Sequence, residues 1–260
     1  MRRSVYFAFL LALLAPLSAR AQLQPHRAEY VLRLGADPEA ARIGRAVQDL
    51  SEDCAGWHIV RDMRADLMLT PALGLALASK LIGDESRRSF RYDTVQVQSG
   101  VERRVRGRVE RQESELRAEI VAPDGRPRQL HLPPATLLPV AALQQLIERL
   151  RGGAKSFRVL AFDAEIIQDA FLVEVTQQDP ASLRPARPVD GAFDRPSGKS
   201  WAVDMAFTRG RQDEPPLFNV GAKVFDNGVL DRLTIETGLL SVTADLQGLE
   251  MRSSPSCPRS

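Results

Sequence analysis

Two cysteines that lie far apart in the sequence constrain the fold of this chain more than any other feature. Cys54 lies in segment 52–57, which reads EDCAGW, and Cys257 lies almost at the C-terminus. If the chain is exported, a disulfide is the default state of two lone cysteines in an oxidising compartment. Such a bond would close nearly the whole mature chain into one loop, which favours one domain. The alternative is a catalytic thiol at Cys54 assisted by His58, and no second cysteine lies nearby to form a redox pair with it.

The N-terminus has the three parts of a cleavable signal peptide. Arg2 and Arg3 make its start basic, segment 5–17 is apolar, and Ala19 and Ala21 supply the small residues at −3 and −1. A transmembrane anchor is the alternative, but the apolar run is shorter than the roughly 18 residues that span a bilayer. We therefore expect removal of residues 1–21. Residues 22–260 would form one exported domain, with no integral membrane segment.

Loss of the signal peptide changes the charge of the chain. The full sequence has 35 Lys and Arg residues against 33 Asp and Glu residues, and three arginines leave with residues 1–21. The mature net charge is then near −1, which does not indicate a nucleic-acid partner. One row of basic residues remains at Arg104, Arg106 and Arg108. This row either contacts anionic lipid or forms a solvated strand face that pairs with neighbouring carboxylates.

Alternation of apolar and polar residues recurs along the mature chain and predicts β-strands. We expect ten to twelve antiparallel strands, a number that must curl, close or stack. The motif Asn227-Gly228 is the strongest short signal for a hairpin. The clearest predicted strands are 26–34, 57–69, 88–97, 101–111, 116–122, 201–207, 218–225, 229–235 and 240–247.

Three segments depart from this pattern. Segment 70–84 is apolar in a way that fits either a short helix or a buried strand. Segment 179–200 is rich in Pro, Gly and Asp and predicts a long surface loop. Apolar residues recur at helical spacing from Leu143 to Leu150 and predict an amphipathic helix over 141–150. This helix would plug or cover the sheet; an interfacial membrane helix is the alternative, although the polar face is thin and mixed in charge.

The sequence contains no recognisable catalytic or metal-binding motif. His26, His58 and His131 are scattered and do not have metal-ligand spacing. No Gly-x-Ser-x-Gly elbow, phosphate loop or Gly-x-Gly-x-x-Gly motif is present. Acidic pairs such as Asp163 and Glu165 are common on surface strands. We predict no catalytic residue, no metal, no cofactor and no enzymatic activity.

Several segments, in order, resemble the cell envelope integrity EipB family. The segments read PHRAEY at 25–30, DCAGW at 53–57, LPPATLLP at 132–139, RVLAFD at 158–163, SWAV at 200–203, DNGV at 226–229, GLL at 238–240 and LE at 249–250.

This resemblance implies a mainly β, soluble periplasmic protein. Its antiparallel sheet would curl into an open β-spiral or half-barrel, similar to lipoprotein carriers of the LolA/LolB type, with a disulfide between Cys54 and Cys257. Family members are associated with envelope maintenance and have no assigned enzymatic activity.

Three hypotheses about function follow. The concave face of the spiral could hold a lipid, another hydrophobic ligand or an envelope partner protein. The chain could instead be a purely structural interaction scaffold whose interior is filled by its own side chains and helix. It could also be an uncharacterised periplasmic hydrolase. The sequence does not identify the ligand-binding residues.

Overall fold

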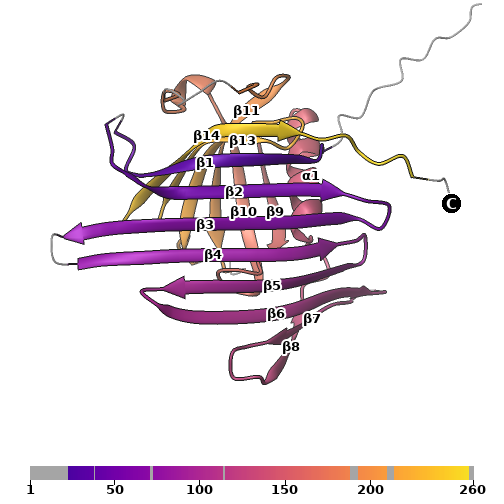
Figure 1. Ribbon diagram of the computed structural model, residues 1–260. Coiled ribbons are helices and arrows are strands. Elements are labelled where there is room, and N and C mark those ends of the chain that lie inside the picture. Colours follow the sequence, from indigo (N-terminus) through magenta and orange to yellow (C-terminus); the bar gives the residue numbers. More distant parts are fainter. Residues whose placement is uncertain are drawn as a thin grey trace, which may run out of the picture.

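A computed structural model describes residues 23–37, 39–70, 73–113, 115–187, 193–209 and 214–257. The expected signal peptide, residues 1–21, lies outside the described residues. The described chain forms one antiparallel sheet of 14 strands with one α-helix (Figure 1). The strands are β1 (His26–Leu34), β2 (Arg42–Glu52), β3 (Trp57–Thr70), β4 (Leu73–Glu85), β5 (Ser89–Gln98), β6 (Val101–Gln112), β7 (Glu115–Val121), β8 (Pro127–Leu132), β9 (Ser156–Phe162), β10 (Ala170–Gln178), β11 (Ser200–Thr208), β12 (Phe218–Phe225), β13 (Leu230–Glu236) and β14 (Ser241–Met251).

The sheet consists of two meanders that join in its middle. Strands β1 to β8 form the N-terminal half and β9 to β14 form the C-terminal half, and β1 pairs with β14. Strands β8 and β9 are the two ends of the sheet, which is therefore open. Leu137 crosses this opening, because it forms a parallel bridge to Ala161 of β9. The prediction of an open, curled antiparallel sheet is confirmed.

One sequence prediction about the strands needs correction and one is resolved. The sheet has 14 strands rather than ten to twelve. Segment 70–84, which fitted either a helix or a buried strand, contains most of strand β4, so the strand alternative holds. Leu75, Leu77 and Leu81 alternate along β4 and contribute to the two hydrophobic clusters of the interior, so burial of this face explains the strand.

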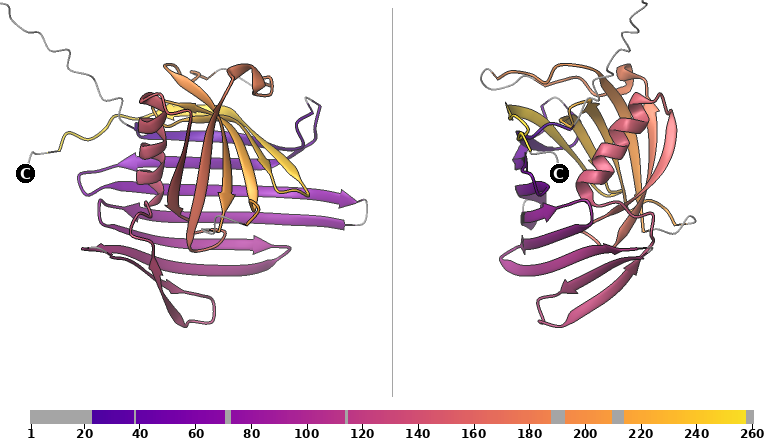
Figure 2. Two further views of the ribbon diagram at one scale, coloured as in Figure 1. Left: turned by 180° about the vertical axis from the view of Figure 1, so that it is seen from behind. Right: turned by 90° about the vertical axis from the view of Figure 1, so that its right-hand side faces the viewer.

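The predicted amphipathic helix is confirmed as α1 (Pro139–Arg151). Val140, Leu146, Ile147 and Leu150 are buried on one face, as the helical spacing predicted. The helix lies inside the curved sheet, between its two halves (Figure 2). It therefore fills one end of the spiral interior rather than lying on an outer surface.

The core is built around aromatic contacts between the two halves. Phe90 and Tyr92 of β5 stack with ring centroids 5.3 Å apart, and Phe162 of β9 contacts both rings. Gly107 lies opposite Tyr92 on β6. A Cβ atom at Gly107 would lie 2.2 Å from the Tyr92 ring, so glycine makes this close packing possible. A second cluster under β1 and β14 contains Tyr30, Leu32 and Leu246, among others.

The disulfide between Cys54 and Cys257 is present, with the two Cα atoms 5.5 Å apart. Cys54 lies in the β2–β3 turn, where Asp53 Oδ1 accepts hydrogen bonds from the backbone N–H groups of Ala55 and Gly56. Gly56 has φ +153°, and a Cβ atom there would lie 2.1 Å from the carbonyl oxygen of Glu85. The EDCAGW segment thus needs its glycine for the close approach of this turn to the end of β4.

The described residues of segment 179–200 form a loop up to the start of β11, as predicted, but not all of them are surface-exposed. After a short 3-10 turn, Pro180–Ser182, the side chains of Arg184 and Arg187 are buried. Both guanidinium groups bind the carboxylate of Asp245 on β14, at 2.5 and 2.8 Å. These ion pairs hold the described part of the loop, up to residue 187, against the outer face of the sheet.

Candidate functional site

The histidines considered in the sequence analysis do not form a site. His26 is buried, and its Nδ1 lies 2.8 Å from the carbonyl oxygen of Gln24; burial lowers its pKa. His58 pairs with Asp84 at 2.8 Å, and His131 is exposed. Among the described residues, no group of three or more His, Cys, Asp or Glu side chains could hold a metal ion.

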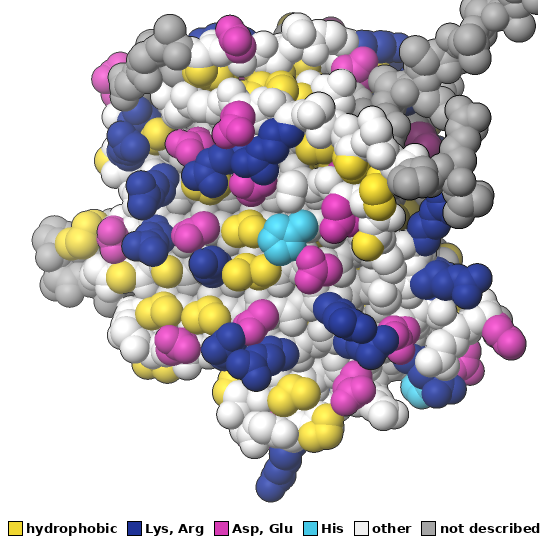
Figure 3. Space-filling view, turned by 45° about the vertical axis from the view of Figure 1, so that its right-hand side comes forward, with side chains coloured by type: hydrophobic (Ala, Val, Ile, Leu, Met, Phe, Trp, Pro, Cys, Tyr) yellow, Lys and Arg dark blue, Asp and Glu magenta, His cyan; other side chains and the backbone are white. Residues whose placement is uncertain are grey.

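The arginine row on β6 forms ion pairs with carboxylates of neighbouring residues. Arg104 and Arg106 both bind Asp93 of β5, at 2.5 and 3.2 Å, and Arg108 pairs with Glu110. Hydrogen bonds from Arg104 hold the pKa of Asp93 below its usual range. Basic and acidic side chains are interspersed over the face shown in Figure 3. The contacts match the ion-paired alternative, and contact with anionic lipid stays a prediction.

The interior of the spiral contains an apolar cavity of about 530 Å³. Its walls come from β2 to β5 of the N-terminal half, from β9 to β13 of the C-terminal half with the β9–β10 turn, and from the start of α1. Phe171, Phe207 and Phe218 form one wall, with ring centroids 4.6 to 5.6 Å apart. Met63 and Ile235 contribute further apolar surface. We call this space the interior cavity.

One side of the interior cavity is polar. Glu165, in the β9–β10 turn, accepts a hydrogen bond of 2.8 Å from Arg61 of β3 and one of 3.1 Å from the Ser79 hydroxyl. Gln96 of β5 donates to the backbone carbonyl oxygen of Glu165 at 2.7 Å. The Nε of Arg61 is buried and has no hydrogen-bond partner. The cavity thus combines an aromatic wall with one incompletely bonded guanidinium, whose Nε is buried although the Arg61 side chain is 42% exposed.

Asp163 shapes the turn that presents Glu165. Its carboxylate accepts hydrogen bonds from the backbone N–H groups of Ile166 and Ile167, at 2.6 and 2.7 Å. Burial raises the pKa of Asp163. The acidic pair Asp163 and Glu165 therefore has two separate structural roles, since one residue caps the turn and the other binds Arg61 across the interior.

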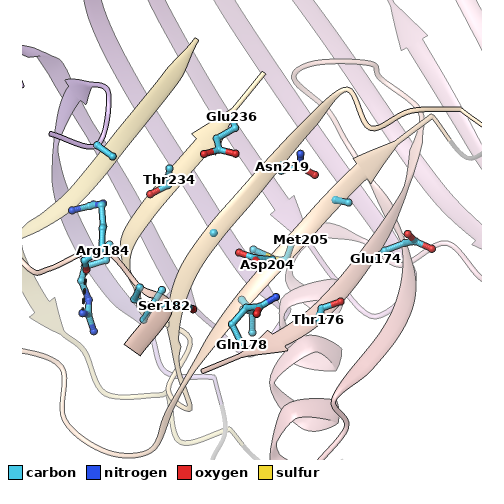
Figure 4. A pocket seen from close by; sticks show the side chains of 16 residues that line it. Glu174, Thr176, Gln178, Ser182, Arg184, Asp204, Met205, Asn219, Thr234 and Glu236 are labelled. Carbon is cyan, nitrogen blue, oxygen red and sulfur yellow. Dashed lines mark hydrogen bonds between the residues drawn. The ribbon is translucent and has the colours of Figure 1, made fainter. Parts of the chain in front are cut away.

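Two other hollows have different linings. A groove of about 620 Å³ lies on the outer face of the C-terminal half, with α1 on the far side of the sheet (Figure 4). Glu174, Thr176, Asp204 and Asn219 line it, and its polar character is unlike that of a lipid site. A third hollow, of about 750 Å³, lies beside the disulfide and the start of α1. Small-molecule sites are mostly apolar with a few polar groups, which favours the interior cavity.

The third hollow contains an unusual buried carboxylate, Glu85. It accepts hydrogen bonds from the backbone N–H groups of Val140 and Ala141, at 2.7 and 2.9 Å, and so caps the N-terminus of α1 from strand β4. Burial is the main cause that raises the pKa of Glu85 to about 7. This cap is a tertiary contact from a distant strand. The N-cap residue itself, Leu138, makes no side-chain hydrogen bond, so the sequence around the helix start does not predict the cap.

Glu85 predicts a pH-dependent contribution to stability. A pKa raised on folding from 4.5 to about 7 gives stability that is complete below pH 4.5 and is lost as the pH rises through about 7. Replacement by glutamine should remove this dependence. We expect the difference in unfolding free energy between the wild type and Glu85→Gln to change by about 3 kcal/mol between pH 4.5 and 8. Urea denaturation over this range measures the change, and Glu148→Gln, at an exposed residue of α1, is the control. Equal slopes for wild type and Glu85→Gln would contradict the account.

The sequence places the cavity residues on strands but does not show that they meet. Phe171, Phe207, Phe218 and Ile235 each lie at or next to a strand end in the C-terminal half. Met63 and Arg61 come from β3, in the other half of the sheet. The cavity arises because the curled sheet brings these halves face to face, which no local pattern encodes. The one available signal is a phenylalanine at corresponding ends of three successive strands.

Comparisons with known proteins place this fold in a family. The model of the EipB-like family matches residues 17–253. The cell envelope integrity protein EipB of Brucella abortus is 23% identical over 249 residues, which cover 91% of this chain and 87% of that protein. A crystal structure from Brucella abortus, described as a beta-barrel-like protein of a domain of unknown function, superimposes with a TM-score of 0.71 at 20% identity. The match covers 90% of this chain and 100% of that one.

The structural match agrees with the open curled sheet. At 20% identity, this structural similarity is evidence for the fold alone. Among the described residues, no helix is long and apolar enough to cross a membrane. Because the family model spans most of the sequence, the chain belongs to the EipB-like family.

Proposed function

We propose that this chain is a non-catalytic periplasmic protein that supports cell envelope integrity by holding a hydrophobic ligand in its interior cavity. The role in the envelope follows from family membership, since the Brucella relative is named for it. The cavity is the observation that carries the ligand proposal. Its volume of about 530 Å³ lies within the range of small-molecule sites, about 300 to 1,000 Å³.

The lining of the cavity favours an amphiphile with one acyl chain. Phe171, Phe207 and Phe218 offer apolar surface to a chain, and each methylene group buried there contributes about 0.8 kcal/mol. Arg61 offers a partly bonded guanidinium at the polar side, where Glu165 is its present partner. An anionic or hydrogen-bonding head group can accept from the exposed part of the Arg61 guanidinium, while the tail follows the aromatic wall.

The two competing functions have weaker support. A purely structural scaffold requires an interior filled by its own side chains, whereas α1 fills only one end and the cavity remains. A hydrolase requires a nucleophile, a base and an orienting group within reach of one another. Within the described part of the cavity wall, the acidic groups Asp163 and Glu165 instead bind the backbone and Arg61.

Filling the cavity should weaken ligand binding. Ala142 of α1 lines the interior cavity and is half-buried, so Ala142→Trp places an indole in the space of the ligand. We expect binding of a fluorescent long-chain fatty acid, displaced by unlabelled palmitate, to weaken at least tenfold. The matched control is Ala206→Trp, which adds the same side chain to the polar outer groove.

The control variant should bind like the wild type. Circular dichroism and the melting temperature of each variant would show whether the fold is retained. Fatty-acid binding that is equal in wild type and Ala142→Trp would overturn the interior cavity as the ligand site. Absence of binding by a folded wild type would overturn the acyl-chain proposal itself.

A further inference from the structure

An ion pair lies where the interior cavity meets solvent. Arg61 Nη1 donates to Glu165 Oε2 at 2.8 Å, so β3 of one half of the sheet is joined to the β9–β10 turn of the other half. Arg61, whose side chain is 42% exposed, and Ile166, which is 61% exposed, both line the cavity. We call the place marked by Arg61, Glu165 and Ile166 the mouth of the cavity. A ligand whose chain fills the cavity would place its polar end there.

Arg61 has hydrogen-bond donors that the fold does not use. A guanidinium carries several N–H groups in a planar fork. Among the described residues, Arg61 makes one hydrogen bond, to Glu165, and its buried Nε has no partner. The exposed part of the guanidinium therefore keeps N–H donors for a phosphate or a carboxylate, which are the anions that its geometry matches.

Glu165 has acceptor positions that the fold does not use. Its carboxylate accepts hydrogen bonds from Arg61 and from the Ser79 hydroxyl, one at each oxygen. An ionised carboxylate offers about four lone-pair positions, so acceptor positions remain. The Gln96 amide donates to the backbone carbonyl oxygen of Glu165 and so fixes the turn without occupying the carboxylate. A cationic donor can therefore bind Glu165 while Arg61 stays in place.

The charges around the cavity disfavour a ligand with a net negative charge. Among the described residues that line it, Arg61 is basic, whereas Asp62, Asp163 and Glu165 are acidic. Asp62 pairs with Arg64, and Asp163 accepts from backbone N–H groups, so neither needs a partner from a ligand. A purely anionic head group that took Arg61 would leave Glu165 uncompensated, which is the costly case for a charge shielded from water. A purely cationic head group would leave Arg61 uncompensated in the same way.

We propose that the Arg61–Glu165 pair is the head-group site for a zwitterionic lipid with one acyl chain. The phosphate of the lipid accepts from Arg61, and its ammonium group donates to Glu165. The two unlike charges of the ligand then meet the two unlike charges of the pair, and each charge at the mouth has a partner. This inference rests on the proposed function, since the acyl chain occupies the interior cavity. It makes Glu165 the residue that selects between head groups.

Two lysolipids that differ only at the end of the head group test the proposal. Lysophosphatidylethanolamine with a myristoyl chain carries a phosphate and an ammonium group. Lysophosphatidylglycerol with the same chain keeps the phosphate but has hydroxyl groups in place of the ammonium. Isothermal titration calorimetry below the critical micelle concentration measures the dissociation constant of each from the mature, disulfide-bonded chain. We expect the wild type to bind the zwitterion about tenfold more tightly, since it gains one charge-assisted hydrogen bond.

Variants of the pair separate the contributions of its two residues. Glu165→Gln should remove the selectivity, so that the two lysolipids bind within about twofold of each other. Arg61→Gln should weaken the binding of both, because both carry the phosphate. The matched control is Glu174→Gln, which removes a carboxylate that pairs with Arg158 and lines the outer groove. This control should keep the wild-type selectivity, and circular dichroism would show whether each variant retains the fold.

The other outcomes would overturn the inference. Selectivity that survives in a folded Glu165→Gln variant would do so, as would tighter binding of lysophosphatidylglycerol by the wild type. Equal binding of both lysolipids by the wild type, weakened by Ala142→Trp, would overturn the zwitterion site and leave the proposed function standing. Absence of binding for both lysolipids and for the fatty acid would overturn the proposed function as well. The wild-type comparison requires no substitution, so the test holds even where a variant does not fold.

Discussion

Replacement of both Cys54 and Cys257 by serine should lower the free energy of unfolding by up to about 5 kcal/mol. The disulfide links residues 203 positions apart, and the loss of chain entropy in the unfolded state grows with the length of the closed loop. The tail has further contacts, because Arg252 binds Asp49 at 2.5 Å and donates its backbone N–H to the carbonyl oxygen of Pro25. These contacts should keep the tail near β1 and β2 after the bond is removed.

Urea denaturation with and without a reductant measures this effect. The wild type should lose stability on reduction, and the double serine variant should match the reduced wild type and not respond to reductant. Serine at Cys54 alone leaves one thiol and serves to detect intermolecular disulfides. An oxidised wild type with the same unfolding midpoint as the double variant would contradict a stabilising role for the bond.

Asp245→Asn should destabilise the fold by about 3 to 5 kcal/mol. Asp245 is buried and binds the guanidinium groups of Arg184 and Arg187, whose side chains are 9% and 6% exposed. Removal of one charge from a buried ion network leaves the opposite charges uncompensated, and this is the costly case. Arg187 also donates to the carbonyl oxygen of Asp37, so the substitution should loosen the loop and the β1–β2 turn together.

Chemical denaturation of Asp245→Asn measures the loss, and Asp204→Asn is the control. Asp204 is exposed in the outer groove, where a surface substitution usually changes stability by less than about 0.5 kcal/mol. Proteolysis should also cleave the loop that contains Arg184 faster in Asp245→Asn than in the wild type. Equal stability of the two variants would show that the buried ion network is not needed.

Local patterns predicted most of the fold because they report burial within a single strand. The alternation of Phe90, Tyr92 and Thr94 identified β5, and the spacing of Leu143 and Leu150 identified α1. Strand β4 was ambiguous, since Leu75 and Leu81 face the interior while Ile82, on the opposite face, is also apolar. Periodicity alone cannot separate such a strand from a helix.

Contacts between distant segments could not be read from the sequence in the same way. Arg184 and Arg187 lie in a stretch rich in proline, which reads as a surface loop, and their partner Asp245 is about 60 residues further on. The cap that Glu85 provides for α1 has the same origin. The interior cavity depends on the largest sequence separation of these three features, because it exists only where β3 of one half faces β12 of the other.

Native mass spectrometry of the chain purified from the periplasm under non-reducing conditions tests the central claim most directly. The account predicts a signal-cleaved, disulfide-bonded wild type with a lipid-sized adduct, and an Ala142→Trp variant of the expected mass without it. An Ala206→Trp control should retain the adduct. A folded, oxidised wild type with no adduct at any gentle setting, or an adduct that persists in Ala142→Trp, would contradict ligand binding in the interior cavity.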